Sequence, residues 1–128
     1  MSHDYSVQVR WTGNRGEGTR TYESNERDHE VVVEGKPVLL GSADGAFRGD
    51  ESRHNPEDLL VASLSACHML WYLSLCAKAR IVVVEYEDSA QGTMEIDSDG
   101  GGRFTSVLLQ PRVRVEPGAD HEGLDGHG

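Results

Sequence analysis

The chain has few cysteines, few prolines and few basic residues. Its 128 residues include two Cys and four Pro, and 12 Lys and Arg stand against 22 Asp and Glu. Two cysteines cannot build the framework of several disulfides that is typical of small secreted domains. The net charge of −10 argues against nucleic acid and against an anionic membrane surface, since both bind to basic faces. We therefore expect no nucleic-acid partner and no membrane partner.

Long hydrophobic runs are also scarce. The first residues, MSHDYSVQVRWTG, lack the apolar core of a signal peptide, so we expect a cytoplasmic protein. One long apolar run extends from Leu59 to Ala79. We do not interpret it as a membrane span, because amphipathic strand patterns flank it and five side chains with polar groups interrupt it: Ser63, Ser65, His68, Tyr72 and Ser74. A chain of this length without an internal repeat forms one compact domain, residues 1–128.

Hydrophobic periodicity predicts an α+β domain with an antiparallel sheet and one long helix. The segments with a strand pattern or a short apolar run are residues 4–11, 19–24, 29–35, 37–41, 81–96 and 104–117. Asn55 is a good N-cap for the helix, Pro56 suits its first position, and no Gly or Pro follows until past Arg80. The helix therefore spans about 24 residues, or roughly 36 Å.

Apolar residues lie on every side of this helix, in the segment LLVASLSACHMLWYLSLCAKA, residues 59–79. A helix of that kind is buried on most sides. One small sheet covers a single side, so we expect a partner subunit to cover the rest.

Both cysteines lie on the helix, nine residues apart, as Cys67 and Cys76. That separation places them on opposite faces and about 13 Å apart along the axis, whereas a disulfide needs Cα atoms within about 7 Å. They cannot pair within one intact helix. We expect Cys76 in the core. Cys67 has two interpretations, a small buried hydrophobe or a reactive thiolate, and the second needs a cation from elsewhere in the protein.

Glu57 and His68 are the other candidates for chemistry on the helix. Glu57 precedes Cys67 by ten residues, about 15 Å along the axis. The two meet on one substrate only if they come from different copies of the helix or if the chain folds back; otherwise Glu57 complements the helix dipole. His68 points about 100° away from Cys67, and a satisfied core histidine is the simpler interpretation.

No metal and no cofactor is expected. The tail residues His121, Glu122 and His127 fit no standard zinc spacing. The segment DGGGR, residues 99–103, opens no helix and is therefore not a phosphate-binding loop.

The segment NPEDLLVASLSACHM, residues 55–69, resembles the OsmC/Ohr family, the osmotically inducible protein C and organic hydroperoxide resistance proteins. In that family the long central helix begins with Asn-Pro-Glu and carries a cysteine ten residues after the Glu, as Asn55-Pro56-Glu57 and Cys67 do here. The resemblance covers roughly residues 5–116 and points to a branch other than the best-studied one. It implies an intertwined homodimer with active sites at the subunit interface, where Glu57 and Cys67 could converge from different chains.

The resemblance implies a thiol-dependent peroxidase that reduces organic hydroperoxides in oxidative stress defence. It assigns Cys67 as the peroxidatic cysteine, Glu57 as the acid that orients an activating arginine, and Arg48 as that arginine. Arg20 and Arg27 are the alternatives for the arginine. A guanidinium beside Cys67 would stabilise its thiolate and hydrogen-bond the peroxide.

Three aromatic side chains could line a pocket for the alkyl chain of a substrate, although core packing explains them equally well: Phe47, Trp71 and Tyr72. The sequence departs from the family in one respect, because the family's resolving cysteine follows the hairpin and no cysteine follows Cys76 here. We expect that these residues lack the family's C-terminal helix and strand, or that an external thiol or dithiol reduces Cys67. The alternative function is a non-catalytic OsmC-like domain that binds a small apolar ligand or has a structural role.

Overall fold

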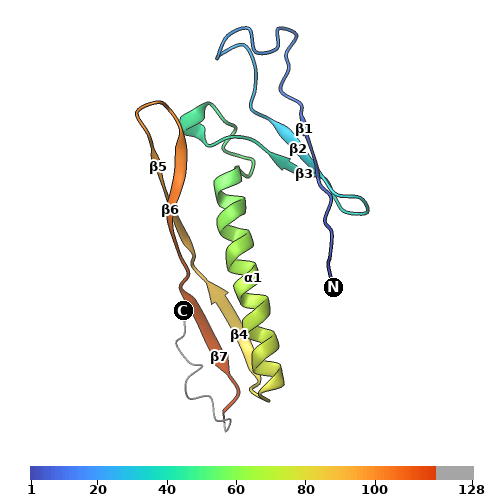
Figure 1. The fold of residues 1–128 in the computed structure, drawn as a ribbon, viewed down its shortest axis with the longest axis vertical. Coiled ribbons are helices and arrows are strands. Elements are labelled where there is room, and N and C mark those ends of the chain that lie inside the picture. The colour runs from blue at the N-terminus through green and yellow to red at the C-terminus, as the bar shows by residue number, and fades with distance from the viewer. Residues whose placement is uncertain (118–128) are drawn as a thin grey trace. The chain divides into compact units, whose positions relative to one another are not determined.

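The computed structural model describes residues 1–117 and divides the chain into two compact units, Met1–Pro56 and Glu57–Gly128. The first unit holds β1 (Gln8–Trp11), β2 (His29–Val32), β3 (Leu39–Gly41) and the 3-10 helix η1 (Gly45–Phe47). Helix α1 (Pro56–Lys78) begins at the boundary, and β4 (Val83–Asp88), β5 (Gln91–Ile96), β6 (Gly102–Leu108) and β7 (Pro111–Val115) follow it (Figure 1). The predicted α+β class, with antiparallel pairing and one long helix, is confirmed.

The first unit is built on a three-stranded antiparallel sheet in the order β1-β2-β3. Trp11 of β1 pairs with His29 of β2, and His29 pairs with Gly41 of β3. The His29 imidazole lies over Gly41, where an added Cβ would come within 2.5 Å of its Nε2 atom. Glycine at this position therefore lets the His29 ring pack against β3.

The prediction of a strand at residues 19–24 is wrong. Asn14 Oδ1 accepts hydrogen bonds from the N–H groups of Gly16 and Gly18, at 2.9 Å each. Ser24 Oγ donates to the Gly18 carbonyl at 2.9 Å and accepts from the Thr21 N–H at 3.1 Å. Polar side chains of this kind offer the backbone local partners that compete with a strand ladder, so the segment between β1 and β2 folds into turns.

Helix α1 begins and ends close to the predicted positions, and its C-terminus closes without glycine. Arg80 adopts a left-handed backbone conformation with φ of 61°. Its N–H donates to the Ala77 carbonyl at 3.1 Å, and the Ile81 N–H donates to the Cys76 carbonyl at 2.8 Å. This pair of bonds satisfies two carbonyls at the helix end, as in a Schellman motif, and turns the chain back toward β4.

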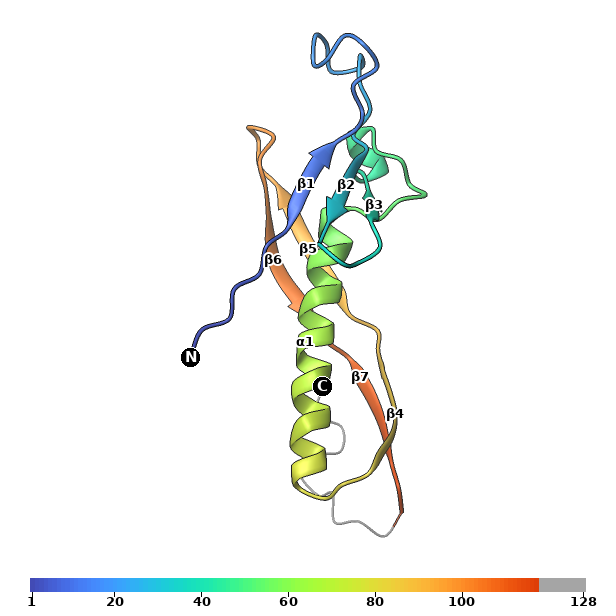
Figure 2. The same cartoon turned by 90° about the vertical axis from the view of Figure 1, so that its right-hand side faces the viewer.

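The two long strands predicted at residues 81–96 and 104–117 are each broken in the structure. The first predicted strand breaks after Asp88. The second breaks at Gln110, whose N–H donates to the Asp88 carboxylate at 2.7 Å. Pro111 has no N–H with which to continue the ladder. Strand β4 therefore pairs with β7, and β5 pairs separately with β6, both antiparallel. Figures 1 and 2 both show α1 running beside β4 and β7.

The core of the second unit lies between α1 and the β4–β7 pair. Tyr72, Cys76 and Ile81 are buried there. The half-buried side chains that pack against them are Val83, Tyr86, Val113 and Val115. Only 1% of the Cys76 surface is exposed, which confirms the predicted core position of this cysteine.

Helix α1 also carries large apolar side chains that are exposed. They are Leu60, Leu64, Leu70, Trp71 and Leu75. By length and composition, α1 is apolar enough to cross a membrane, with a mean hydropathy of 1.6 over an 18-residue window. Core helices of soluble proteins pass the same test, so this property is weak evidence for a membrane span.

Candidate functional site

Cys67 lies near the middle of α1, on a side of the helix other than the one that packs on β4 and β7. Positions facing the strands recur every three or four residues and are buried or half-buried: Val61, Ser65, His68, Tyr72 and Cys76. The Cys67 side chain is free and exposed. The sulfur is therefore accessible in the single chain, which the reactive-thiolate interpretation requires and the buried-hydrophobe interpretation does not fit.

The two thiols differ sharply in their surroundings. Both are free, but Cys67 is exposed and Cys76 is buried. The prediction that these cysteines do not pair within the helix is confirmed. Cys76 is therefore a control for experiments on Cys67, because the two thiols share one helix and differ in their access to solvent.

The surface next to Cys67 is apolar and slightly hollow. Leu70 and Trp71, three and four residues further along α1, share its side of the helix, and they are 62% and 64% exposed. Together with Ser74 they line a shallow hollow of about 260 Å³. No formal charge lies among the lining residues, so this surface favours an uncharged group beside the thiol.

Polar contacts fix the turn of α1 that carries Cys67 to strand β4. Two residues before Cys67, Ser65 Oγ donates to Asp88 Oδ2 at 2.6 Å. One residue after it, His68 Nδ1 and Tyr86 Oη are hydrogen-bonded at 3.1 Å. His68 is half-buried and has a partner, so the expectation of a satisfied core histidine is confirmed. These bonds set the rotation of α1 about its axis at the level of Cys67.

Tyr86 sits among aromatic rings at this level. Its ring centroid is 5.8 Å from that of Tyr72, and the Tyr72 ring is stacked on His68 at 6.4 Å. Burial, followed by the negative charge of Asp88, raises the pKa of the Tyr86 phenol above its ordinary value of 10.0. The protonated phenol shares a hydrogen bond with the His68 ring, in which the donor depends on the imidazole tautomer. Tyr72 itself is 8% exposed, so it belongs to the core and not to a substrate pocket.

The three candidate arginines differ in what their guanidinium groups contact. Arg20 forms an ion pair with Glu17 at 3.3 Å. Arg27 donates to the Tyr22 carbonyl at 2.8 Å and lies over the Tyr22 ring, 4.2 Å from its centroid. The Arg48 side chain is exposed and forms no ion pair or hydrogen bond within residues 1–117. Arg48 is thus the candidate whose charge remains free for a ligand.

The remaining predicted residues occupy separate positions. Glu57 lies in the first turn of α1, where a carboxylate complements the helix dipole. It is on the same helix as Cys67, ten residues away, so one copy of α1 keeps the two apart as predicted. Phe47 is partly exposed in η1. Phe47 and Arg48 belong to the first unit and Cys67 to the second, so neither unit alone contains all the predicted site residues.

The part of the chain that the structure describes holds no candidate metal centre, since no group of three or more His, Cys, Asp or Glu side chains there is arranged to hold an ion. The tail residues weighed as ligands lie outside the described residues: His121, Glu122 and His127.

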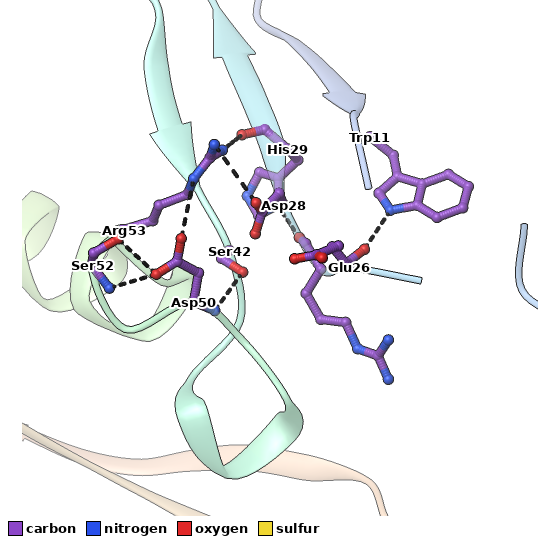
Figure 3. A network of polar contacts seen from close by, with 9 residues as sticks. Trp11, Glu26, Asp28, His29, Ser42, Asp50, Ser52 and Arg53 are labelled. Atoms are coloured by element: carbon purple, nitrogen blue, oxygen red, sulfur yellow. Dashed lines mark hydrogen bonds and ion pairs between the residues drawn. The ribbon is translucent and has the colours of Figure 1, made fainter. Parts of the chain in front are cut away.

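Sequence reasoning missed the buried network that holds the loop before α1. Ser42 is fully buried, and its Oγ accepts the Asp50 N–H at 3.0 Å (Figure 3). The hydrogen bonds from the Ser52 hydroxyl and then the Ser52 N–H lower the pKa of Asp50, and Arg53 adds to this effect. Arg53 also bonds the first sheet through Asp28, at 3.6 Å. Serine is common in loops, so no sequence pattern distinguishes buried Ser42 from exposed Ser52 in the same loop.

Comparisons with known proteins agree with the motif on α1. A family model described as OsmC-like protein matches residues 49–125. Among solved structures, an OsmC-like protein of unknown function from Vibrio cholerae is 32% identical, with a TM-score of 0.81 over 93% of this chain and 79% of that one. An OsmC-like protein from Mycoplasma pneumoniae shares the fold at 12% identity, with a TM-score of 0.67 over 94% of this chain and 74% of that one. None of the curated proteins matches. The chain therefore belongs to the OsmC-like family.

Proposed function

We propose that this protein is a thiol-dependent peroxidase that reduces organic hydroperoxides, with Cys67 as its nucleophile and oxidative stress defence as its role. The observation that carries the proposal is the exposed Cys67 thiol on a side of α1 where Leu64 and Trp71, each within about one turn of it, are also exposed. The OsmC-like family, to which the chain belongs, includes peroxidases.

In the proposed reaction, the Cys67 thiolate attacks one oxygen of the hydroperoxide. A sulfur–oxygen bond forms while the oxygen–oxygen bond breaks, and the departing alkoxide takes a proton and leaves as an alcohol. The peroxide is reduced by two electrons, and Cys67 is oxidised to a sulfenic acid. The step needs no metal and no cofactor.

We assign Arg48 as the cation of the reaction. A guanidinium stabilises a neighbouring thiolate and can hydrogen-bond a peroxide oxygen as negative charge develops on it. Arg48 is supported over Arg20 and Arg27 because its guanidinium, alone of the three, forms no hydrogen bond or ion pair within residues 1–117. We assign Glu57 as the acid that orients Arg48, in an assembly of two chains.

The surface around Cys67 supports an organic substrate in preference to hydrogen peroxide. Leu70 and Trp71 present apolar area within one turn of the thiol. Burial of an alkyl or aryl group against them contributes about 25 cal/mol for each Å² of apolar area removed from water. Hydrogen peroxide has no such group and gains nothing from this surface.

We propose that an external thiol or dithiol completes the cycle. Cys76 cannot attack the Cys67 sulfenic acid, because it is buried in the core on another side of the same helix. A small external thiol would displace water from the sulfenic acid and form a mixed disulfide. A second thiol would then release reduced Cys67 and a disulfide of the reductant.

We also propose that two chains form a homodimer through the exposed side of α1. Residues along this side follow alternating spacings of four and three, which is the spacing of helices that pack along a seam. They are Leu60, Leu64, Cys67, Trp71, Ser74 and Lys78. Cys67 then lies at the interface, so we propose that the two helices leave a gap beside it through which the hydroperoxide and the external thiol enter. The exposed leucines and Trp71 supply apolar surface of the kind found in dimer interfaces.

Stopped-flow consumption of cumene hydroperoxide by the reduced protein tests the proposal. We expect the wild type and Cys76→Ala to consume one equivalent rapidly and to form a sulfenic acid that dimedone traps at Cys67. Cys67→Ser is expected to consume none. If all three proteins are equally inert while folded, the peroxidase proposal is wrong, and a domain that binds a small apolar ligand becomes the better interpretation.

A further inference from the structure

The loop that carries Arg48, residues 42–54, is closed at its base and packed internally. The Ser42 N–H donates to the His54 carbonyl at 2.9 Å, and Gly41 forms a parallel bridge with His54. Arg53 ties the loop to the first sheet, through an ion pair with Asp28 and a hydrogen bond to the His29 carbonyl (Figure 3). A loop held in this way presents its tip in one conformation.

The backbone N–H groups from residue 47 to residue 50 are all satisfied inside the loop. The Asp44 carbonyl accepts from Phe47 at 2.8 Å and from Gly49 at 3.1 Å, and the Gly45 carbonyl accepts from Arg48 at 3.1 Å. For residue 50 the acceptor is a side chain, Ser42 Oγ, at 3.0 Å. The backbone of this segment is therefore fully hydrogen-bonded within the loop, while the Arg48 side chain is exposed.

Two features show that this conformation is imposed on the chain. Arg48 has a left-handed backbone with φ of 63°, which is uncommon for a residue other than glycine. Arg48 is the C-cap of η1, and this conformation ends the 3-10 helix there. Gly49 lies so close to the Ala43 carbonyl that an added Cβ would come within 1.6 Å of its oxygen. Only glycine therefore fits at the position that follows Arg48.

We propose that Ser42 is a positioning residue for Arg48, and this inference rests on the proposed peroxidase function. Its buried hydroxyl accepts the Asp50 N–H, the last of these amides, and so helps to keep Arg48 in its left-handed backbone conformation. The exposed guanidinium is then carried by a loop that keeps one conformation. Without the hydroxyl, the Asp50 N–H loses its acceptor, the loop relaxes and the guanidinium is displaced.

A double-mutant cycle on the peroxidase rate tests this role. We expect Arg48→Ala to lower the second-order rate constant for cumene hydroperoxide by roughly 10²-fold, as for the loss of one donor to a developing oxyanion. Ser42→Ala should lower it by roughly tenfold, because small misplacements of a catalytic group are costly. In the Arg48→Ala background, Ser42→Ala should have no further effect, since its action passes through Arg48.

The pH profile of Cys67 alkylation by iodoacetamide supplies a second readout. Ser42→Ala should move this profile toward higher pH, in the direction that Arg48→Ala moves it. Ser52→Ala is the matched control, because the Ser52 hydroxyl is in the same loop but bonds the exposed Asp50 carboxylate at 2.6 Å and no amide of residues 47–50. It should leave both the rate and the profile at wild-type values.

The outcomes separate this inference from the proposed function. If Arg48→Ala is slow but Ser42→Ala matches the wild type, the positioning role is wrong and the peroxidase proposal stands. An equal loss from Ser42→Ala in both backgrounds also overturns the role, because it shows an effect independent of Arg48. If Arg48→Ala has no effect, the assignment of the cation fails and the positioning role fails with it.

Hydrogen exchange of the wild-type protein tests the contact without any variant. The Asp50 amide should exchange far more slowly than the Ala46 amide in the same loop, whose acceptor lies 3.4 Å away on an exposed side chain. Equal exchange rates would show that the Ser42 hydroxyl does not hold the loop, even if Ser42→Ala failed to fold.

Discussion

The Asp88 carboxylate joins three elements of the second unit, and its removal should be costly. It accepts the Ser65 hydroxyl at 2.6 Å from α1 and the Gln110 N–H at 2.7 Å from the turn before β7. A hydrogen bond to a charged group contributes about 1.5–3 kcal/mol to stability. We place the Ser65–Asp88 bond near the lower end of this range, because it is only half-buried. The Gln110 bond is exposed and adds about 0.5 kcal/mol, because solvent screens it. We expect Asp88→Ala to lower the free energy of unfolding by about 2 kcal/mol.

Urea unfolding at fixed protein concentration measures this effect, since association makes stability depend on concentration. Asp88→Asn should lose about half as much, because the amide keeps one carbonyl acceptor. Glu87→Gln is the matched control on the same strand. Its exposed ion pair with Arg112, at 2.8 Å, should be worth less than about 0.5 kcal/mol.

A cycle with Ser65→Ala isolates the buried contact. The coupling between Ser65→Ala and Asp88→Ala should be about 1 kcal/mol, because each variant removes the same hydrogen bond. A coupling close to zero, or a loss from Asp88→Ala no larger than that from Glu87→Gln, would refute the reasoning. Asp88→Asn should also lower the pKa of Tyr86, because the Asp88 charge helps to raise it.

Three further predictions concern separate parts of the second unit. The pKa of Tyr86 is higher in the folded protein than its ordinary value of 10.0. Its contribution to stability is therefore complete below the pKa of the unfolded state, and it is lost as the pH rises through the pKa of the folded state. Urea unfolding of Tyr86→Phe should therefore depend less on pH above 10 than that of the wild type, and parallel profiles would contradict this. Arg80→Gly should stabilise the protein by about 1 kcal/mol, because glycine adopts the left-handed conformation at the end of α1 without strain; an unchanged urea midpoint would argue against it. Trp71→Glu should shift the protein from dimer to monomer in analytical ultracentrifugation, whereas Lys36→Glu on an exposed turn should not, and a dimer that survives Trp71→Glu would exclude this side of α1 as the interface.

The long helix was predictable because its signals are local. Pro56 fits the first position, and the acids after it complement the dipole. The nine-residue separation of Cys67 and Cys76 predicted that the two thiols lie on different faces of the helix, but it left open whether Cys67 is buried or exposed. Local signals of this strength leave little room for tertiary contacts to override them.

The errors arose where a contact distant in sequence determines the backbone. The break between β4 and β5 depends on Asp88 meeting Gln110 and Ser65, and no periodicity encodes that meeting. The pairing of His68 with Tyr86, 18 residues away, could not be inferred from either residue alone. Ser42 was missed for the same reason, because its partner Asp50 lies across a loop.

The burial of Cys76 gives the protein an internal reporter of its own unfolding. This thiol is enclosed by Tyr72 and Ile81, so a reagent reaches it when the strands separate from α1. Its modification rate therefore measures the free energy of opening of the second unit, without any introduced label. In an oxidising environment, the oxidation state of Cys76 would distinguish chains that stayed folded from chains that had unfolded. Native chains would react at Cys67 alone, and an irreversibly oxidised Cys76 would mark a chain that had lost its fold before it met the oxidant.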